Sequence, residues 1–224
     1  MNLRPMLIVN GVLIAGMAAV SAWAWATIPE GTQLPMQINV HGNPVRYVDK
    51  TQFLVLMPAT ALAVTLLFWF LPRIDPRRAN LEASAKFWSA GAILSVALLA
   101  YVHALLVLNA TVLKIDLLSA LVPALSVLFI GLGNYLGKTK SNWFGGVRTP
   151  WSMSSEYSWE QTHRWSGRMM VASGLAALVA WFFVDTKTAF IILIGLVLAT
   201  SALSIVLSYI FWRADPERAA NGTH

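Results

Sequence analysis

The chain alternates between long apolar runs and shorter polar connections, and this pattern predicts its elements. A helix needs roughly twenty consecutive apolar residues to cross a bilayer. Six runs meet this requirement, at residues 5–26, 51–71, 87–108, 117–136, 165–184 and 188–212. The fifth run has Arg168 in its first turn, so this long side chain must extend to the headgroups for the helix to reach across. The pattern predicts an all-α membrane protein, a bundle of six transmembrane helices.

The composition agrees with a membrane location. The chain is 57% hydrophobic and 12% charged, which leaves too little polar surface for a soluble domain. It contains no cysteine, which excludes disulfides, thiolate metal sites and a cysteine nucleophile. Its basic start followed by an apolar run is also typical of a signal peptide, but the run continues to Ala26 without a clean small-residue cleavage site. We therefore expect the first helix to be retained.

The distribution of lysine and arginine predicts the orientation. Six crossings place both termini on one side. Twelve basic residues fall on that side, namely Arg4, Arg73, Arg77, Arg78, Lys86, Lys138, Lys140, Arg148, Arg164, Arg168, Arg213 and Arg218, and four fall opposite, namely Arg46, Lys50, Lys114 and Lys187. Because cytoplasmic loops of membrane proteins are enriched in lysine and arginine, we expect both termini in the cytoplasm. The net charge of +6 flanks apolar runs instead of forming one stripe, so no nucleic-acid partner is expected.

The connections divide the chain into two regions. Residues 1–110 form an N-terminal three-helix region with an extracytoplasmic loop at 27–50, and residues 111–224 form a second three-helix region with a cytoplasmic segment at 138–164. The outer loop is rich in glycine, proline and asparagine, which favour turns, and has room for one short extended piece at 36–40. The tight links after the third and fifth helices predict antiparallel helix hairpins.

A short motif occurs twice, as RIDPRRAN at 73–80 and RADPERAAN at 213–221. Each copy follows a crossing toward the side of the termini. One interpretation is convergence, in which arginine anchors the helix end, aspartate caps a short helix and proline takes its first position. The other is duplication of a three-helix unit, for which the rest of the sequence offers no match between the halves.

The polar, tryptophan-rich segment between Lys138 and Arg168 is the strongest candidate for a functional site. Gly145 and Gly146 predict a flexible turn, and Pro150 favours an extended backbone at the residue before it. Ser154 is predicted to cap a helix that continues into the fifth crossing. The aromatic residues of the segment are expected at headgroup depth, and they are Trp143, Phe144, Trp151, Trp159 and Trp165.

Two interpretations of this segment remain open from spacing alone. In the first, Asn142, Arg148, Glu160, His163 and Arg164 converge in a polar pocket that binds or relays a ligand. In the second, the segment is an interfacial helix in which Glu160 and Arg164 form an i,i+4 pair worth about 0.2–0.5 kcal/mol.

Glu160 and His163 also have the spacing of a helical carboxylate and histidine pair in a metal site. Two further ligands are available in the sequence. Glu156 lies one turn back, and His103 lies near the opposite face of the membrane and is expected to be hydrogen-bonded inside the bundle. No metal and no cofactor are therefore expected. An enzyme that uses the pair as acid and base is a further alternative, but without a nucleophile or cofactor motif the chain is not expected to be an enzyme. Gly133 and Gly137 predict close helix packing.

Three consecutive motifs resemble the signature of a known family. They are Gly133-Asn134-Tyr135-Leu136, then Asn142 through Ser152 with the sequence NWFGGVRTPWS, then Trp159-Glu160-Gln161-Thr162-His163-Arg164 followed by Gly167. In order and spacing they are similar to the SdpI family of bacterial multi-pass membrane proteins. The first half resembles the three-helix domain of unknown function that often precedes this signature, through Leu34, Pro35, His41, Gly42, Pro44, Tyr47 and Lys50. The outer loop is shorter here than in that domain, and His41 stands directly before Gly42.

The resemblance implies a protein of the bacterial cell membrane that gives immunity to, or senses, a secreted toxic peptide. It also implies signalling by recruitment of a cytoplasmic repressor, so the expected partners are the lipid bilayer, a peptide toxin and a repressor. The implied site residues are Asn134, Asn142, Gly146, Arg148, Thr149, Pro150, Trp151, Trp159, Glu160, Thr162, His163 and Arg164, with Pro35, His41, Gly42, Pro44 and Tyr47 in the outer loop. The alternative is a small transporter or lipid-handling protein whose pocket between Asn142 and Arg164 binds an anion or headgroup.

Overall fold

The computed structural model of the protein describes residues 1–39 and 43–220, so His41 and Gly42 of the outer-loop prediction lie outside the described residues. Within them, six helices are long and apolar enough to span a membrane. They are α1 (Arg4–Thr27), α2 (Lys50–Ile74), α4 (Ala85–Thr111), α5 (Leu117–Leu136), α7 (Glu156–Phe183) and α8 (Thr186–Arg213). The predicted six-helix membrane bundle is confirmed. The fifth predicted crossing, at residues 165–184, is the later part of α7, whose first turns are the helix predicted to continue into that crossing.

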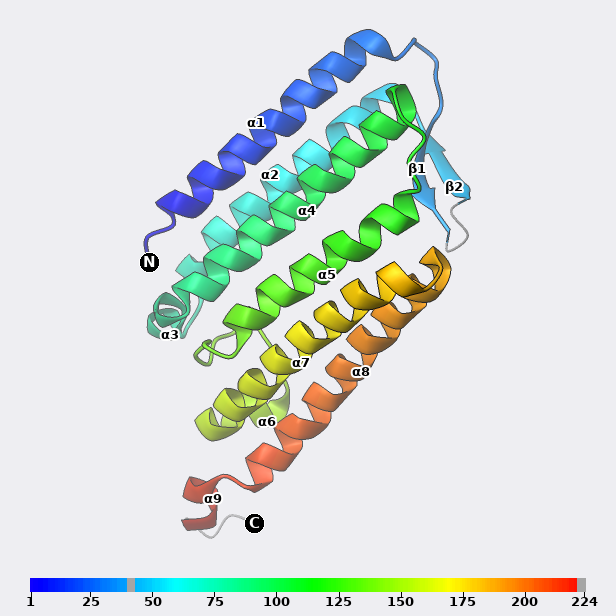
Figure 1. Ribbon diagram of the computed structural model, residues 1–224. Coiled ribbons are helices and arrows are strands. Elements are labelled where there is room, and N and C mark those ends of the chain that lie inside the picture. Colours follow the sequence, from blue (N-terminus) through cyan, green and yellow to red (C-terminus); the bar gives the residue numbers. More distant parts are fainter. Residues whose placement is uncertain (40–42, 221–224) are drawn as a thin grey trace.

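The long helices pack as two groups of three. Helix α4 packs against α1 and α2, α7 packs against α5 and α8, and α4 also contacts α5. The short helices α3 (Arg78–Ala83), α6 (Pro150–Ser154) and α9 (Pro216–Ala220) lie at the end of the bundle where α1 begins (Figure 1). The strands β1 (Leu34–Ile38) and β2 (Pro44–Val48) lie at the opposite end. The segments predicted for opposite membrane faces are thus at opposite ends of the bundle.

The loop between α1 and α2 is a β-hairpin. The strands β1 and β2 are antiparallel, with Leu34 opposite Val48 and Pro35 opposite Tyr47. The extended piece predicted at 36–40 corresponds to β1, which begins two residues earlier, but the second strand was not predicted. Pro44 had indicated a turn, yet it takes the first position of β2, where a residue without a backbone N–H is tolerated.

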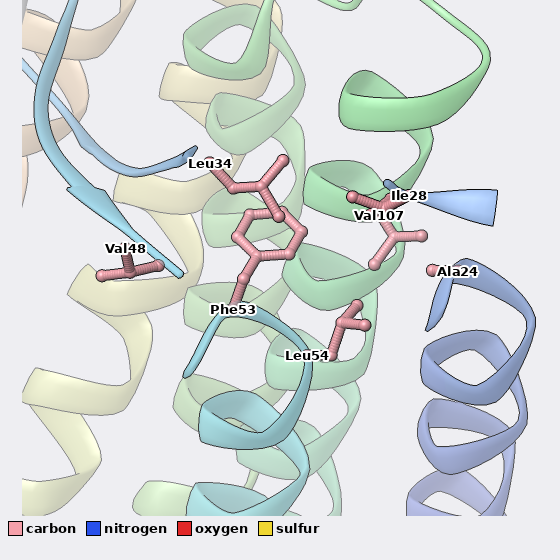
Figure 2. Close-up of a cluster of buried hydrophobic side chains, with 7 residues drawn as sticks. All are labelled: Ala24, Ile28, Leu34, Val48, Phe53, Leu54 and Val107. Atoms are coloured by element: carbon pink, nitrogen blue, oxygen red, sulfur yellow. The ribbon is translucent and has the colours of Figure 1, made fainter. Parts of the chain in front are cut away.

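A buried apolar cluster fixes the base of this hairpin to the helices (Figure 2). Leu34 and Val48 from the two strands pack with side chains of α1, α2 and α4 and with the residue that follows α1. These side chains are Ala24 of α1, Phe53 and Leu54 of α2, Val107 of α4, and Ile28 after α1. Beside the cluster, Lys50 Nζ lies 2.8 Å from a Glu30 carboxylate oxygen. The hairpin is therefore anchored at its base, while Val45 and Tyr47 on β2 stay exposed.

The two copies of the Asp-Pro motif fold differently. In the second copy, Pro216 begins α9 and Asp215 Oδ1 accepts a hydrogen bond from the Glu217 N–H at 3.0 Å, which confirms the predicted cap. In the first copy, Asp75 Oδ1 accepts the equivalent hydrogen bond from the Arg77 N–H at 2.7 Å, but the predicted helix start at Pro76 was wrong, because Asp75 directly follows α2 and α3 begins only at Arg78. The proline at position 76 disfavours helical backbone at Asp75, which is extended with ψ 122°.

Helices α5 and α7 approach each other closely at glycines. A Cβ atom on Gly133 would lie 2.7 Å from the carbonyl oxygen of Gly167, and one on Gly167 would lie 2.6 Å from that of Gly133. A Cβ on Gly137 would lie 3.2 Å from Arg164 Cα. The predicted close packing at Gly133 and Gly137 is confirmed.

Helices α7 and α8 are joined by hydroxyl groups along much of their length. Ser166 Oγ donates to Ser204 Oγ at 2.7 Å, and Ser158 Oγ donates to the carbonyl oxygen of Ser208 at 2.7 Å. The sequence had indicated only apolar crossings here. Because lipid offers no hydrogen-bond partners, such bonds between helices help to hold α7 and α8 together.

Candidate functional site at the α5–α7 connector

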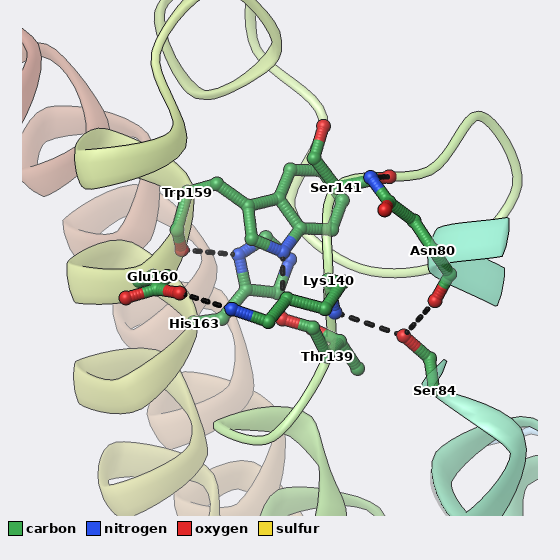
Figure 3. A network of polar contacts seen from close by, with 8 residues as sticks. All are labelled: Asn80, Ser84, Thr139, Lys140, Ser141, Trp159, Glu160 and His163. Carbon is green, nitrogen blue, oxygen red and sulfur yellow. Dashed lines mark hydrogen bonds and ion pairs between the residues drawn. The ribbon is translucent and has the colours of Figure 1, made fainter. Parts of the chain in front are cut away.

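The polar segment predicted to be functional corresponds to the connector between α5 and α7, residues 137–155, together with the first turns of α7. Trp159 on α7 is fully buried beneath it, and its Nε1–H donates to the carbonyl oxygen of Thr139 at 3.0 Å (Figure 3). The Trp159 indole and the His163 imidazole are stacked, with ring centroids 3.9 Å apart. These two rings form the platform on which the connector folds.

His163 is fully buried, and both of its ring nitrogens are hydrogen-bonded. The Val147 N–H donates to Nε2 at 2.9 Å, and Nδ1 lies 2.8 Å from the carbonyl oxygen of Trp159. Because Nε2 accepts a hydrogen bond, the ring is neutral and its proton is on Nδ1. His163 therefore holds the connector backbone in place, and neither nitrogen is free for a ligand.

Gly146 is required where the connector crosses His163. Its φ of 100° lies in the left-handed region, and a Cβ at this position would be only 2.2 Å from His163 Nε2. A residue with a side chain would be strained and would also clash with the ring. The glycine turn predicted from the sequence thus has a steric cause.

Asn142 organises the turn that precedes Gly146. Its Oδ1 accepts hydrogen bonds from the N–H groups of Phe144 at 3.0 Å and Gly145 at 2.7 Å, and its Nδ2 donates to the carbonyl oxygen of Lys140 at 2.9 Å. The side chain is fully buried. Such local side-chain bonds replace the regular secondary structure that the connector lacks.

Thr149 and Pro150 begin the short helix α6. Thr149 and Ser152 form a reciprocal capping box, and Thr149 Oγ1 also donates to Ser208 Oγ on α8 at 2.8 Å. The predicted cap at Ser154 was wrong, because α6 includes that residue and Ser155 caps α7 instead. The sequence contains two adjacent candidate serines, Ser154 and Ser155, and only the break between α6 and α7 selects between them.

The connector is also held by residues that the sequence had not indicated as part of the site. Asp75 Oδ2 accepts from the Trp143 N–H at 3.1 Å, and Arg77 donates to Ser141 Oγ. At the other side, Ser155 Oγ donates to Asp215 Oδ2 at 2.6 Å. Both aspartates belong to the repeated Asp-Pro motif, which was the sequence signal that could have identified them.

Polar groups between α2 and α4 complete this support (Figure 3). Asn80 Nδ2 donates to the carbonyl oxygen of Ser141 at 2.8 Å, and the Lys140 N–H donates to Ser84 Oγ at 2.8 Å. The connector thus contacts the first group of helices as well as α7 and α8.

Glu160 pairs with Lys140 across the connector and not with Arg164 one turn along the helix, so the predicted i,i+4 pair is not what forms. The hydrogen bond from Lys140 to Glu160, together with the charge of that carboxylate, raises the pKa of the lysine above its ordinary value. Glu160 faces Lys140, whereas His163 bonds to backbone groups, so the two side chains do not converge on one ligand position. Among the described residues, no group of three or more histidine, aspartate or glutamate side chains could hold a metal ion.

The structure separates the five side chains that were predicted to form one polar pocket. Asn142 and His163 are buried in the connector. Arg148 is exposed, donates to the Trp143 carbonyl oxygen and lines a cavity of about 380 Å³ with Ser166 and Ser204. Arg164 is exposed on α7 and lines a different opening, between α5 and α7.

The remaining predicted residues are placed as follows. Thr162 is fully buried, and its hydroxyl has no partner within the described part of the chain. Trp151 packs edge-on against Tyr209, with ring centroids 5.2 Å apart. Asn134 is exposed on α5 and lines the same opening as Arg164. Pro35, Pro44 and Tyr47 lie on the hairpin at the other end of the bundle.

Comparison with known proteins agrees with the resemblance found in the motifs. The SdpI/YfhL protein family matches residues 138–208, which include the connector, α6, α7 and α8 as far as the serine that bonds to Thr149. Immunity protein SdpI of Bacillus subtilis (strain 168) is 25% identical over 187 residues, which cover 83% of this chain and 86% of that protein. No solved structure matches the chain significantly. The family match over residues 138–208 and the similarity along most of the chain support membership of the SdpI family for this multi-pass bacterial membrane protein.

Proposed function

We propose that this protein protects its cell against a secreted toxic peptide that acts at the membrane. The observation that supports this most strongly is the similarity to an immunity protein along 83% of the chain, which extends beyond the family segment at 138–208 into the helices before it. Similarity that extends over most of both chains favours a shared role over a shared fragment.

The hairpin between α1 and α2 is the proposed surface for the peptide. The excess of lysine and arginine at the other end of the bundle supports an extracytoplasmic position for β1 and β2. Val45 and Tyr47 alternate on one face of β2 and are 61% and 56% exposed. An exposed strand edge with apolar side chains can bind an extended peptide by adding a strand to the sheet.

The α5–α7 connector is the proposed surface for a cytoplasmic partner, such as a repressor. Most of its motif residues fold the segment, but Arg148 is exposed and the adjacent Trp143 is 50% exposed. Tryptophan and arginine are the residues most enriched at the energetic centres of protein interfaces. The buried network under them keeps both side chains on a fixed backbone.

Expression in a bacterial strain that is sensitive to the peptide toxin tests the immunity role. We expect cells that produce the protein to survive doses that kill cells with an empty vector. The same killing curve for both strains, with the protein detected in the membrane fraction, would contradict the proposal.

Two variants separate the proposed surfaces. Tyr47→Ser on the hairpin is expected to reduce survival, and Arg148→Ala is expected to reduce the response of a repressor-controlled reporter. Arg213→Ala is the matched control for Arg148→Ala, because Arg213 is also exposed and lies at the same end of the bundle but outside the connector. Equal reporter responses for the two arginine variants would exclude a specific role for Arg148.

A further inference from the structure

A groove of about 630 Å³ runs along the surface between α5 and α7. Its volume lies in the range of small-molecule binding sites. Along α7, the residues that line the groove change from basic at one end to apolar at the other. It consists of Gly133, Asn134, Gly137, Lys138, Arg164, Gly167, Arg168, Val171, Ala172 and Leu175.

Three basic side chains lie at one end of the groove. Lys138, Arg164 and Arg168 are all exposed, and within the described residues none of them forms an ion pair. Arg168 lies against the exposed Trp165, with its Cζ 5.3 Å from the ring centroid. Tryptophan prefers headgroup depth in a bilayer, so these cations are at the level of lipid phosphates. The described lining has no acidic residue to neutralise them.

The other end of the groove suits an acyl chain. Val171, Ala172 and Leu175 continue the wall along α7, so that Leu175 lies about 16 Å beyond Arg164 at 1.5 Å per residue. The glycines on the floor have no side chains to fill the space beside the close contact of the two helices. Asn134 lies between the basic and apolar ends, where an amide can bond to an ester carbonyl group.

We propose that this groove binds one anionic phospholipid, with its phosphate at Lys138, Arg164 and Arg168 and the upper part of one acyl chain along Val171 and Leu175. Arginine binds phosphate through two parallel N–H···O bonds, and unpaired cations beside an apolar wall complement a headgroup attached to a chain. The site is on the surface of the bundle, away from the hairpin, and it includes Gly137 and Lys138 of the connector but none of the buried side chains that hold the connector. It therefore goes beyond the proposed immunity role.

Native mass spectrometry of the detergent-purified protein tests this site, with phosphatidylglycerol and phosphatidylcholine added separately. We expect phosphatidylglycerol to bind at least about tenfold more tightly, because each basic residue near a lipid surface contributes roughly a fivefold gain in affinity for negative charge. Equal retention of the two lipids would overturn the proposal. So would equally tight binding of inorganic phosphate, which would indicate a site for free anions.

Charge variants locate the binding. The triple variant K138Q/R164Q/R168Q is expected to lower phosphatidylglycerol affinity roughly a hundredfold. The control triple R4Q/K86Q/R213Q removes the same charge from exposed residues at the same end of the bundle, outside the groove, and is expected to keep affinity within about twofold. An equal loss in both triples would show that only the overall charge matters and would overturn the site.

A steric variant tests the apolar end without changing any charge. Ala172→Phe places a ring in the groove, whereas Ala176→Phe places the same ring on an exposed position of α7 that is not part of the lining. We expect only Ala172→Phe to lower phosphatidylglycerol binding. Unchanged binding by this variant would contradict the position assigned to the acyl chain. Because lipid binding is measured on the purified protein, its result is independent of the killing curves.

Discussion

The α1–α2 loop (residues 28–49) and the α5–α7 connector are both long links between antiparallel helices, yet they are ordered in different ways. The loop pairs its backbone in a hairpin and attaches through the apolar cluster around Leu34 and Val48. The connector has almost no regular structure, and its backbone groups bond to side chains such as Asn142, His163 and Asp75. Buried backbone polar groups need partners in both cases, and the source of those partners decides which side chains remain free.

This difference changes how a sequence signature is interpreted. In the connector and the start of α7, the signature residues Asn142, Trp159 and His163 are fully buried, and their polar groups bond within the fold. In the hairpin, strand pairing occupies only the backbone, and Val45 and Tyr47 stay available on the surface. Substitutions of the buried connector side chains should therefore affect folding first, and substitutions of the exposed Val45 and Tyr47 should mainly affect interactions with a partner.

The largest expected contrast is between Gly31 and Gly146, the two glycines with positive φ in the described part of the chain. Gly146→Ala in the connector adds strain and a Cβ 2.2 Å from His163 Nε2, and we expect the folded protein to be lost or destabilised by more than about 4 kcal/mol. Gly31 in the loop has φ 78°, but no atom lies within 4 Å of an added Cβ. Gly31→Ala should therefore lower the free energy of unfolding by only about 1–2 kcal/mol. Thermal unfolding in detergent, followed by tryptophan fluorescence, measures both.

Similar unfolding temperatures for the two alanine variants would contradict the tight packing of His163 against the connector. They would indicate that backbone strain is the common cause and that the connector can move away from the ring.

The next contrast concerns side chains that bond to backbone N–H groups. Asn142→Ala leaves the N–H groups of Phe144 and Gly145 without their partner, and we expect a loss of about 2–4 kcal/mol in the free energy of unfolding. Asp49→Ala removes the N-cap of α2 at the end of the hairpin loop, and should cost about 1 kcal/mol. Denaturant unfolding of each variant in the same detergent gives both values. A loss of unfolding free energy for Asp49→Ala that equals or exceeds the loss for Asn142→Ala would contradict the larger role assigned to Asn142.

A smaller effect is expected where the connector meets solvent. The side chains of Lys140 and Glu160 are 50% and 39% exposed, so water screens their ion pair. Lys140→Gln should therefore lower stability by less than about 1 kcal/mol, and the loss should shrink further as salt is added. A loss of several kcal/mol that does not depend on salt would mean that this contact belongs to the buried network.

The smallest effect on folding is expected on the hairpin. Tyr47→Ser changes an exposed side chain outside the apolar cluster, so the free energy of unfolding should change by no more than about 0.5 kcal/mol. The same variant is expected to reduce survival in the presence of toxin. Reduced survival together with a clear loss of stability would show that Tyr47 acts through the fold of the hairpin and not through a partner.

The sequence predicted the features that depend on local pattern. The apolar runs identified six crossings because a helix in lipid must be apolar along its whole length, and the spacing of Gly133 and Gly137 indicated close packing. The family signature and the turn at Gly146 were also found in the sequence.

The features that were missed depend on contacts between distant parts of the chain. The bond from Trp143 to Asp75 joins residues 68 positions apart, and no local pattern indicates it. The strand β2 forms because β1 is available to pair with it. For the same reason the spacing of Asn142, His163 and Arg164 could not reveal that two of them are buried while the third lines the groove between α5 and α7.

The most direct test is the accessibility of the two links in intact cells, which the absence of native cysteine makes simple. Single variants Tyr47→Cys and Arg148→Cys place one thiol on the exposed hairpin and one on the exposed part of the connector. A membrane-impermeant maleimide is expected to label Tyr47→Cys in intact cells and Arg148→Cys only after the membrane is permeabilised. Labelling of Arg148→Cys in intact cells, with Tyr47→Cys protected, would contradict the orientation and the roles proposed for both surfaces.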